Sequence, residues 1–237
     1  MKIGIFGDSF ADGRTLEGDH NQHSWATHLA RGLGATSIGY HAHGGSPLYW
    51  SYQQILAHGH LYDRIILAVT EPQRFPVAVG NNRQFVTGYP GADEFRNPLR
   101  DNLRGWFAVS DPDYLSVVQE LFLGDLERRH PNIILIPCFP TSFSDARRQS
   151  YGLFYLQSVN KLAQIQMGLD VNDYSWMDGY IENTGRNRML CHMPWAWQDR
   201  VADRILHSVQ SGKPVPPIES WPLTLTDRDF NTYYLRR

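Results

Sequence analysis

The chain has 237 residues, a length that fits one α/β domain carrying insertions. Its 22 Lys and Arg residues nearly balance its 24 Asp and Glu residues, which argues against a protein that binds nucleic acid by neutralising phosphates. A hydrophobic fraction of 42% excludes an intrinsically disordered chain, and apolar runs such as Ile65–Val69 are too short to cross a bilayer.

The cysteine content and the N-terminal residues bear on the compartment. Cys138 and Cys191 are too few for a disulfide framework, so we expect reduced thiols, although a single bridge between them stays open. After Met1-Lys2 the chain enters an apolar segment directly, without the pattern of a signal peptide. These features predict a cytoplasmic protein that is not a membrane protein.

Strand and helix patterns alternate along the chain. Short apolar runs predict four strands, and apolar spacings of three and four predict five helices. The predicted strands are Ile3–Phe6, Thr36–Tyr40, Arg64–Thr70 and Asn132–Cys138, and the predicted helices are Ser24–Leu33, Leu48–Ala57, Tyr114–Arg129, Leu153–Gln166 and Ala196–Val209. Near-continuous apolar strands are typical of parallel sheets with both faces covered. The pattern therefore predicts a three-layer α/β/α sandwich with a mainly parallel, flavodoxin-like sheet over residues 1–210.

Two segments depart from this alternation. Residues 75–112 are rich in Gly, Pro, Asn and Arg and are long for a connection, which predicts a functional insertion or lid. Several arginines, Arg74 among them, surround it, and a solvated face is the default interpretation, with anion or carbohydrate recognition as the alternative. Residues 211–237 form a proline-rich, aromatic tail that either wraps its own domain or mediates self-association or docking on a protein partner.

Residues with catalytic chemistry follow the predicted strands. In an open α/β sheet, active groups collect outside the carboxyl ends of the strands. Ser9 follows the first strand as a candidate nucleophile, and Gly45 follows the second in a turn whose backbone N–H could approach a substrate oxygen closely. His192 precedes the last helix and is a candidate general base, with helix capping as its alternative role. Asp8 is expected to order the turn through its carboxylate, whereas Ser9 could instead be a helix N-cap.

These residues resemble the conserved blocks of the SGNH (GDSL-type) hydrolases. Ile3-Gly4-Ile5-Phe6-Gly7-Asp8-Ser9 is similar to their first block and His43-Gly44-Gly45-Ser46 to their glycine block, while His192-Met193-Pro194 is similar to the closing block. The resemblance covers roughly residues 1–75 and 185–210. It implies a serine nucleophile at Ser9, a base at His192 and oxyanion donors at Ser9, Gly45 and Thr70.

Two positions depart from the family pattern. The resemblance aligns Thr70 with the family's oxyanion asparagine and Met189 with its acidic residue three positions before the histidine. Losing one oxyanion donor costs roughly 10²–10³ in turnover, and losing the acidic triad member costs on the order of 10⁴. Either a backbone carbonyl near Met189 orients His192 in a dyad, or Asp178 or Glu182 reaches it, or the activity is faint.

The resemblance implies a serine hydrolase acting on O-acetyl or other small acyl esters, with a carbohydrate ester as one substrate class and no cofactor. The alternative is a catalytically impaired scaffold with a binding or structural role. A nucleotide-binding flavodoxin-like protein is disfavoured because acidic groups occupy the first strand-to-helix turn. Histidine pairs such as His41-x-His43 invite a metal interpretation, but none combines with a carboxylate or cysteine at a closing spacing, so no catalytic metal is expected.

Overall fold

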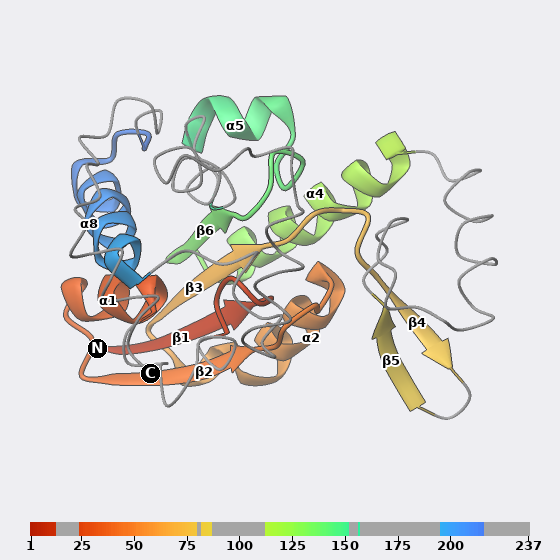
Figure 1. Ribbon diagram of the computed structural model, residues 1–237, viewed down its shortest axis with the longest axis horizontal. Helices are drawn as coiled ribbons and strands as arrows, with labels where there is room; N and C mark the ends of the chain where they lie inside the picture. Colours follow the sequence, from red (N-terminus) through yellow and green to blue (C-terminus); the bar gives the residue numbers. More distant parts are fainter. Residues whose placement is uncertain (13–23, 80–81, 87–111, 152–155, 157–194, 216–237) are drawn as a thin grey trace, which may run out of the picture.

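The computed structural model describes residues 1–12, 24–79, 82–86, 112–151, 156 and 195–215. Four strands in this part of the chain form a parallel sheet (Figure 1). They are β1 (Lys2–Gly7), β2 (Ser37–Ala42), β3 (Arg64–Val69) and β6 (Ile133–Pro137), in the order β2-β1-β3-β6. All four lie where the apolar runs predict them. β1 pairs with β2 on one side and β3 on the other, and this inner position accounts for its burial from Ile3 onward.

Helices flank the sheet on both sides, as the alternating pattern predicts. They are α1 (Trp25–Gly32), α2 (Leu48–His58) with the short 3₁₀ turn η3 (Gly59–Leu61), α4 (Pro112–Arg129), α5 (Asp145–Tyr151) and α8 (Trp195–Ser211). The Ser24 side chain caps α1 by accepting from the backbone N–H of Thr27 at 3.3 Å. The α/β/α fold expected from the sequence is therefore confirmed.

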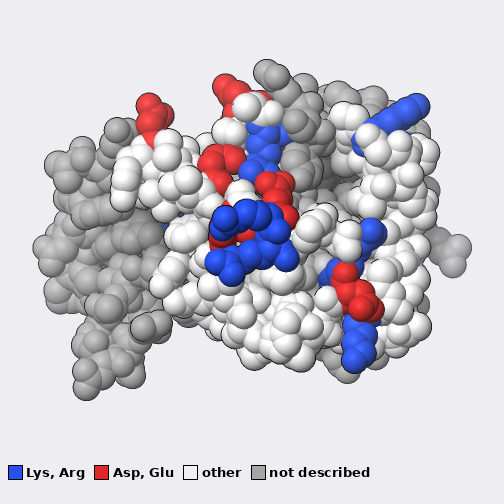
Figure 2. All heavy atoms as spheres, turned by 180° about the vertical axis from the view of Figure 1, so that it is seen from behind, with Lys and Arg blue, Asp and Glu red and all other residues white. Residues whose placement is uncertain are grey.

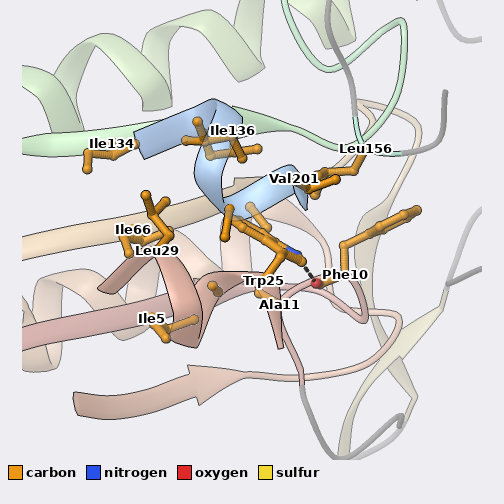
Figure 3. Packing of buried hydrophobic residues seen from close by; sticks show 14 of the residues in the cluster. Ile5, Phe10, Ala11, Trp25, Leu29, Ile66, Ile134, Ile136, Leu156 and Val201 are labelled. Carbon is orange, nitrogen blue, oxygen red and sulfur yellow. Dashed lines mark hydrogen bonds between the residues drawn. The ribbon is translucent and has the colours of Figure 1, made fainter. Parts of the chain in front are cut away.

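Successive strand residues point to opposite faces, so the sheet has two apolar cores. Ile5 and Ile66 face a core completed by α1 and α8, whose Trp25 and Val201 are fully buried (Figure 3). Phe6 and the alternate residues of β3 face a second core completed by α2 and α4. This two-sided burial explains why the strands are continuously apolar rather than alternating.

A two-stranded antiparallel ribbon lies within the segment that the sequence analysis treated as an insertion. It pairs β4 (Phe75–Val79) with β5 (Asn82–Val86) and is separate from the four-stranded sheet (Figure 1). No strand was expected here, because Pro76 and the flanking Gly, Asn and Arg residues hide the short apolar pattern. The helix α5 was also missed, because only 7 residues form it.

Several predicted features fall outside the described residues: most of Leu153–Gln166, most of the 75–112 insertion beyond the ribbon, and the tail from residue 216 onward. Among the helices that the structure does describe, none combines the length and apolar character needed to cross a membrane. On the face seen in Figure 2, acidic and basic side chains lie beside one another, in keeping with the near-balance of charges.

Candidate functional site

The turn after β1 places Ser9 at the carboxyl edge of the sheet. The backbone N–H groups of Ala11 and Asp12 donate to the Asp8 carbonyl at 3.1 and 3.0 Å, which closes the chain into a tight turn around Ser9. Gly7 makes this turn possible, because its φ is +140° and a Cβ there would lie 2.7 Å from the Ala68 side chain. Packing and backbone conformation therefore both require glycine at the first position of the Gly-Asp-Ser sequence.

The glycine turn after β2 lies directly beside the Ser9 turn. The N–H of His43 and the hydroxyl of Ser46 both donate to the Gly7 carbonyl, at 3.0 and 3.2 Å. Asp12 accepts from the Gly44 N–H at 3.1 Å and ties the two turns together from the other side. Gly45 has φ +75°, a left-handed conformation that disfavours any other residue. The sequence-predicted neighbours Ser9 and Gly45 are therefore brought to one place on the sheet edge.

The third sequence-predicted site residue, Thr70, follows β3, the strand on the other side of β1. Its side chain is buried, with 2% of the residue exposed, and its Oγ1 has no hydrogen-bond partner within the described part of the chain. The backbone carbonyl of Thr70 is held by the Gln119 side chain of α4 at 3.0 Å. A buried hydroxyl left without a partner is costly to folding, so this position invites a functional explanation.

A buried ionic cluster lies beneath these turns. Arg74 donates from Nη1 to Asp8 Oδ2 at 2.9 Å and from Nε to Glu71 Oε1 at 3.2 Å, and its guanidinium lies 4.9 Å from the ring centre of Phe139. Asp8 also accepts from the Phe10 N–H at 3.0 Å, so the prediction that it orders the turn is confirmed.

The protonation of the cluster depends on burial. Burial raises the pKa of Glu71, and the nearby Arg74 guanidinium only partly offsets this effect. The Cys138 thiol lies 3.7 Å from Asp8, and burial raises the pKa of this thiol as well. Cys138 is a free cysteine, and its raised pKa favours the neutral thiol over a nucleophilic thiolate.

The default interpretation of Arg74 as part of a solvated face was wrong. Only 14% of its side chain is exposed, and it bonds two carboxylates that are themselves buried. A signal was present in the sequence: an acidic residue in a turn flanked by apolar strands requires a partner of opposite charge. The sequence could not identify which of the arginines supplies it.

Two hydrogen bonds connect the Ser9 turn to the last helix. The indole Nε1 of Trp25 donates to the Phe10 carbonyl at 2.7 Å (Figure 3). The backbone N–H of the same Trp25 donates to Gln198 Oε1 of α8, also at 2.7 Å. Gln198 lies six positions after His192 in the chain. The link was not predicted, since it joins residues 173 positions apart in the sequence.

His192, Met189, Asp178 and Glu182 lie outside the described residues, so the pairing of Ser9 with a base stays a prediction. Of the predicted site residues, the structure brings Ser9, Gly45 and Thr70 to the carboxyl ends of three adjacent strands. Such a group presents a hydroxyl, a glycine turn and a second, buried hydroxyl at one edge. Acyl transfer to a serine needs a hydroxyl nucleophile, oxyanion donors and a general base, and residue types suited to the first two are present at this edge.

No protein-family model matches the chain, and no curated protein matches it either. Solved structures do match at low identity. The acetyl xylan esterase Est2A from the rumen bacterium Butyrivibrio proteoclasticus is 13% identical with a TM-score of 0.40, over 89% of this chain and 64% of that one. A family two carbohydrate esterase from Clostridium thermocellum is 13% identical with a TM-score of 0.39, again over 89% and 64%.

The psychrotrophic esterase EstA from Pseudoalteromonas sp. is 11% identical, with a TM-score of 0.38 over 89% of this chain and 97% of that one. The chain spans less than two thirds of the length of the two carbohydrate esterases. The chain is a distant structural match to these esterases, and its own parallel strand order shows the α/β fold.

Proposed function

We propose that the protein is a serine ester hydrolase that acts on small acyl esters, with O-acetyl groups of a carbohydrate as one substrate class. Ser9 attacks the carbonyl carbon, and His192 takes the serine proton and passes it to the leaving alcohol. The resulting acyl-serine is then hydrolysed by a water molecule that His192 activates in the same way. No cofactor is needed for this chemistry.

The observation that carries the proposal is the hydrogen-bond link from the Ser9 turn to α8. Phe10, next to Ser9, is bonded to Trp25, and Trp25 is bonded to Gln198 in the first turn of α8. His192 precedes the start of α8 by three residues, which span at most about 10 Å when extended. This link supports a pairing between the first and last blocks of the chain.

The oxyanion would be held by the backbone N–H groups of Ser9 and Gly45 together with the Thr70 hydroxyl. The left-handed conformation of Gly45 and the unpartnered hydroxyl of Thr70 support this assignment. Donors that are fixed before the reaction stabilise the developing charge without reorganisation, which is usually the largest single term in such catalysis.

The second candidate function is a scaffold that has lost efficient catalysis. It is favoured by Met189, whose side chain cannot accept the imidazole N–H as the family's acidic residue does. In this alternative the fold and the turns are kept, but no acidic side chain at position 189 orients the imidazole for proton transfer.

Hydrolysis of p-nitrophenyl acetate by the purified protein distinguishes the two functions. The wild type and a Ser37→Ala control, whose serine begins β2 at the opposite edge of the sheet, should turn over the ester at the same rate. Ser9→Ala should reduce the rate to the background level. A wild type with no activity above background, or a Ser9→Ala variant as active as the wild type, would reject the hydrolase.

A further inference from the structure

Arg74 contacts segments that follow three strands of the sheet, β1, β3 and β6. It bonds Asp8 after β1 and Glu71 after β3, and its guanidinium packs over the ring of Phe139 after β6. Since it has 14% side-chain exposure, it is a buried connection between loops rather than a surface charge.

The contact with Asp8 reaches the candidate nucleophile through one carboxylate. Asp8 Oδ2 accepts from Arg74 at 2.9 Å, while Oδ1 accepts from the Phe10 N–H at 3.0 Å. The bond from Phe10 spans Ser9, which lies between Asp8 and Phe10 in the chain. Because the guanidinium is planar and its N–H directions are fixed, it restrains the orientation of the carboxylate as well as its charge.

A second arginine provides a comparison within the same chain. Arg147 of α5 also bonds two carboxylates, those of Glu120 and Glu127, and also packs over a phenylalanine ring, that of Phe143. Its side chain is 13% exposed, almost the same as that of Arg74. Arg147 binds α5 to α4 rather than to the Ser9 turn, so it matches Arg74 in environment but not in position.

We propose that Arg74 is a positioning residue for Ser9: through Asp8 it fixes the turn that carries the nucleophile against the loop that carries Thr70. This inference rests on the proposed function, because the position of Ser9 matters only if Ser9 reacts. Arg74 itself need not touch the substrate, since the connection to the reacting atoms runs through the Asp8 carboxylate and the backbone of the turn.

The test compares Arg74→Met and Arg74→Lys with Arg147→Met and Arg147→Lys, all below their unfolding temperatures. The first readout is the rate at which a fluorophosphonate probe labels Ser9. A displacement of about 1 Å at a reacting group costs about 100-fold, so we expect a loss of that size in Arg74→Met and a smaller loss in Arg74→Lys. Arg147→Met should label within about twofold of the wild type, since its effect is confined to stability.

The second readout does not depend on activity. Amide hydrogen exchange at Phe10, divided by exchange at Leu67 in β3, reports loosening of the turn relative to the whole fold. We expect this ratio to rise about tenfold in Arg74→Met and to stay unchanged in Arg147→Met. If Arg74→Met fails to fold, Asp8→Asn/Arg74→Met removes the charge left unpaired on Asp8 and should show the same rise.

The outcomes separate the two proposals. An unchanged exchange ratio in Arg74→Met or in the double variant overturns the positioning role, whether or not Ser9 is labelled. A raised ratio with no labelling of the wild type rejects the hydrolase while retaining the connection between Arg74 and the turn. Equal labelling of Arg74→Met and Arg147→Met also overturns the positioning role.

Discussion

At the scale of single residues, Thr70 combines burial with a hydroxyl that has no partner in the described structure. An unpaired buried polar group lowers the stability of the fold, whereas an apolar group of the same shape would not. The proposed role of the Thr70 hydroxyl as an oxyanion donor is one explanation for this arrangement, and a purely structural role is the other. The two explanations make opposite predictions for a substitution that preserves the shape.

Thr70→Val removes the hydroxyl and keeps the branched shape. We expect the free energy of unfolding to rise by about 1 kcal/mol, because the unpaired donor is gone. We expect ester turnover to fall by about 10²-fold through the loss of an oxyanion donor. Urea unfolding and p-nitrophenyl acetate hydrolysis measure the two effects. A variant that is less stable than the wild type, with turnover unchanged, would show that the hydroxyl has a structural role only.

Glu71 gives a pH-dependent prediction at the same scale. Burial raises the pKa of its carboxyl above the ordinary value of 4.5, with Arg74 acting against this shift and Asp8 adding to it. The contribution of Glu71 to stability is therefore complete below its ordinary pKa and is lost as the pH rises through the folded-state pKa. An amide at this position does not ionise and escapes the loss.

For Glu71→Gln, the difference in unfolding free energy from the wild type should move in favour of the variant between about pH 4 and about pH 7. Urea denaturation at both pH values measures this difference, with Glu127→Gln as a control at the matched Arg147 cluster. A difference that moves in favour of the wild type as the pH rises would contradict the assigned direction.

At the scale of elements, the sequence predicted the four strands of the sheet and the helices α1, α2, α4 and α8. The strands could be predicted because burial on both faces leaves uninterrupted apolar runs such as Ile65–Val69, and α1 because Ser24 supplies a capping side chain. The β4–β5 ribbon could not, since five-residue strands outside the main sheet leave little apolar pattern.

The candidate site was predictable only as far as local turns specify it. Ser9 and Gly45 were identified because each follows a strand in a turn with a recognisable glycine. Arg74 and the Trp25–Gln198 bond were missed because their contacts depend on the tertiary structure. A guanidinium 66 positions from its carboxylate leaves no local pattern in the sequence.

The packing of α8 against α1 is tested by Gln198→Met. The buried Gln198 oxygen accepts from the first N–H of α1, a donor that no bond within the helix can satisfy. Its loss should lower the unfolding free energy by about 1–3 kcal/mol. Gln53→Met, which removes only a part-buried bond to Tyr49 within α2, should cost about 0.5 kcal/mol or less. Urea denaturation measures both losses. Equal losses would indicate that the α1–α8 bond contributes no more to the unfolding free energy than the part-buried bond within α2.

At the scale of the whole molecule, the fold returns its late helix to its early turn. α8 packs beside α1 on the face of the sheet that carries the core around Ile5 and Ile66 (Figure 1). Trp25 contributes one bond in each direction, to Phe10 and to Gln198. A reaction that needs one residue from the Ser9 turn and one from near α8 would depend on these contacts. Local sequence patterns alone cannot specify them.

The most direct test of this account is the labelling of Ser9 by a fluorophosphonate probe in the wild type and in His192→Gln, with the modified peptide identified by mass spectrometry. The account predicts an adduct on Ser9 in the wild type and a labelling rate at least about 10³-fold lower in His192→Gln, because the serine then lacks its base. An adduct on another residue, or labelling of Ser9 at equal rates in both proteins, would contradict it.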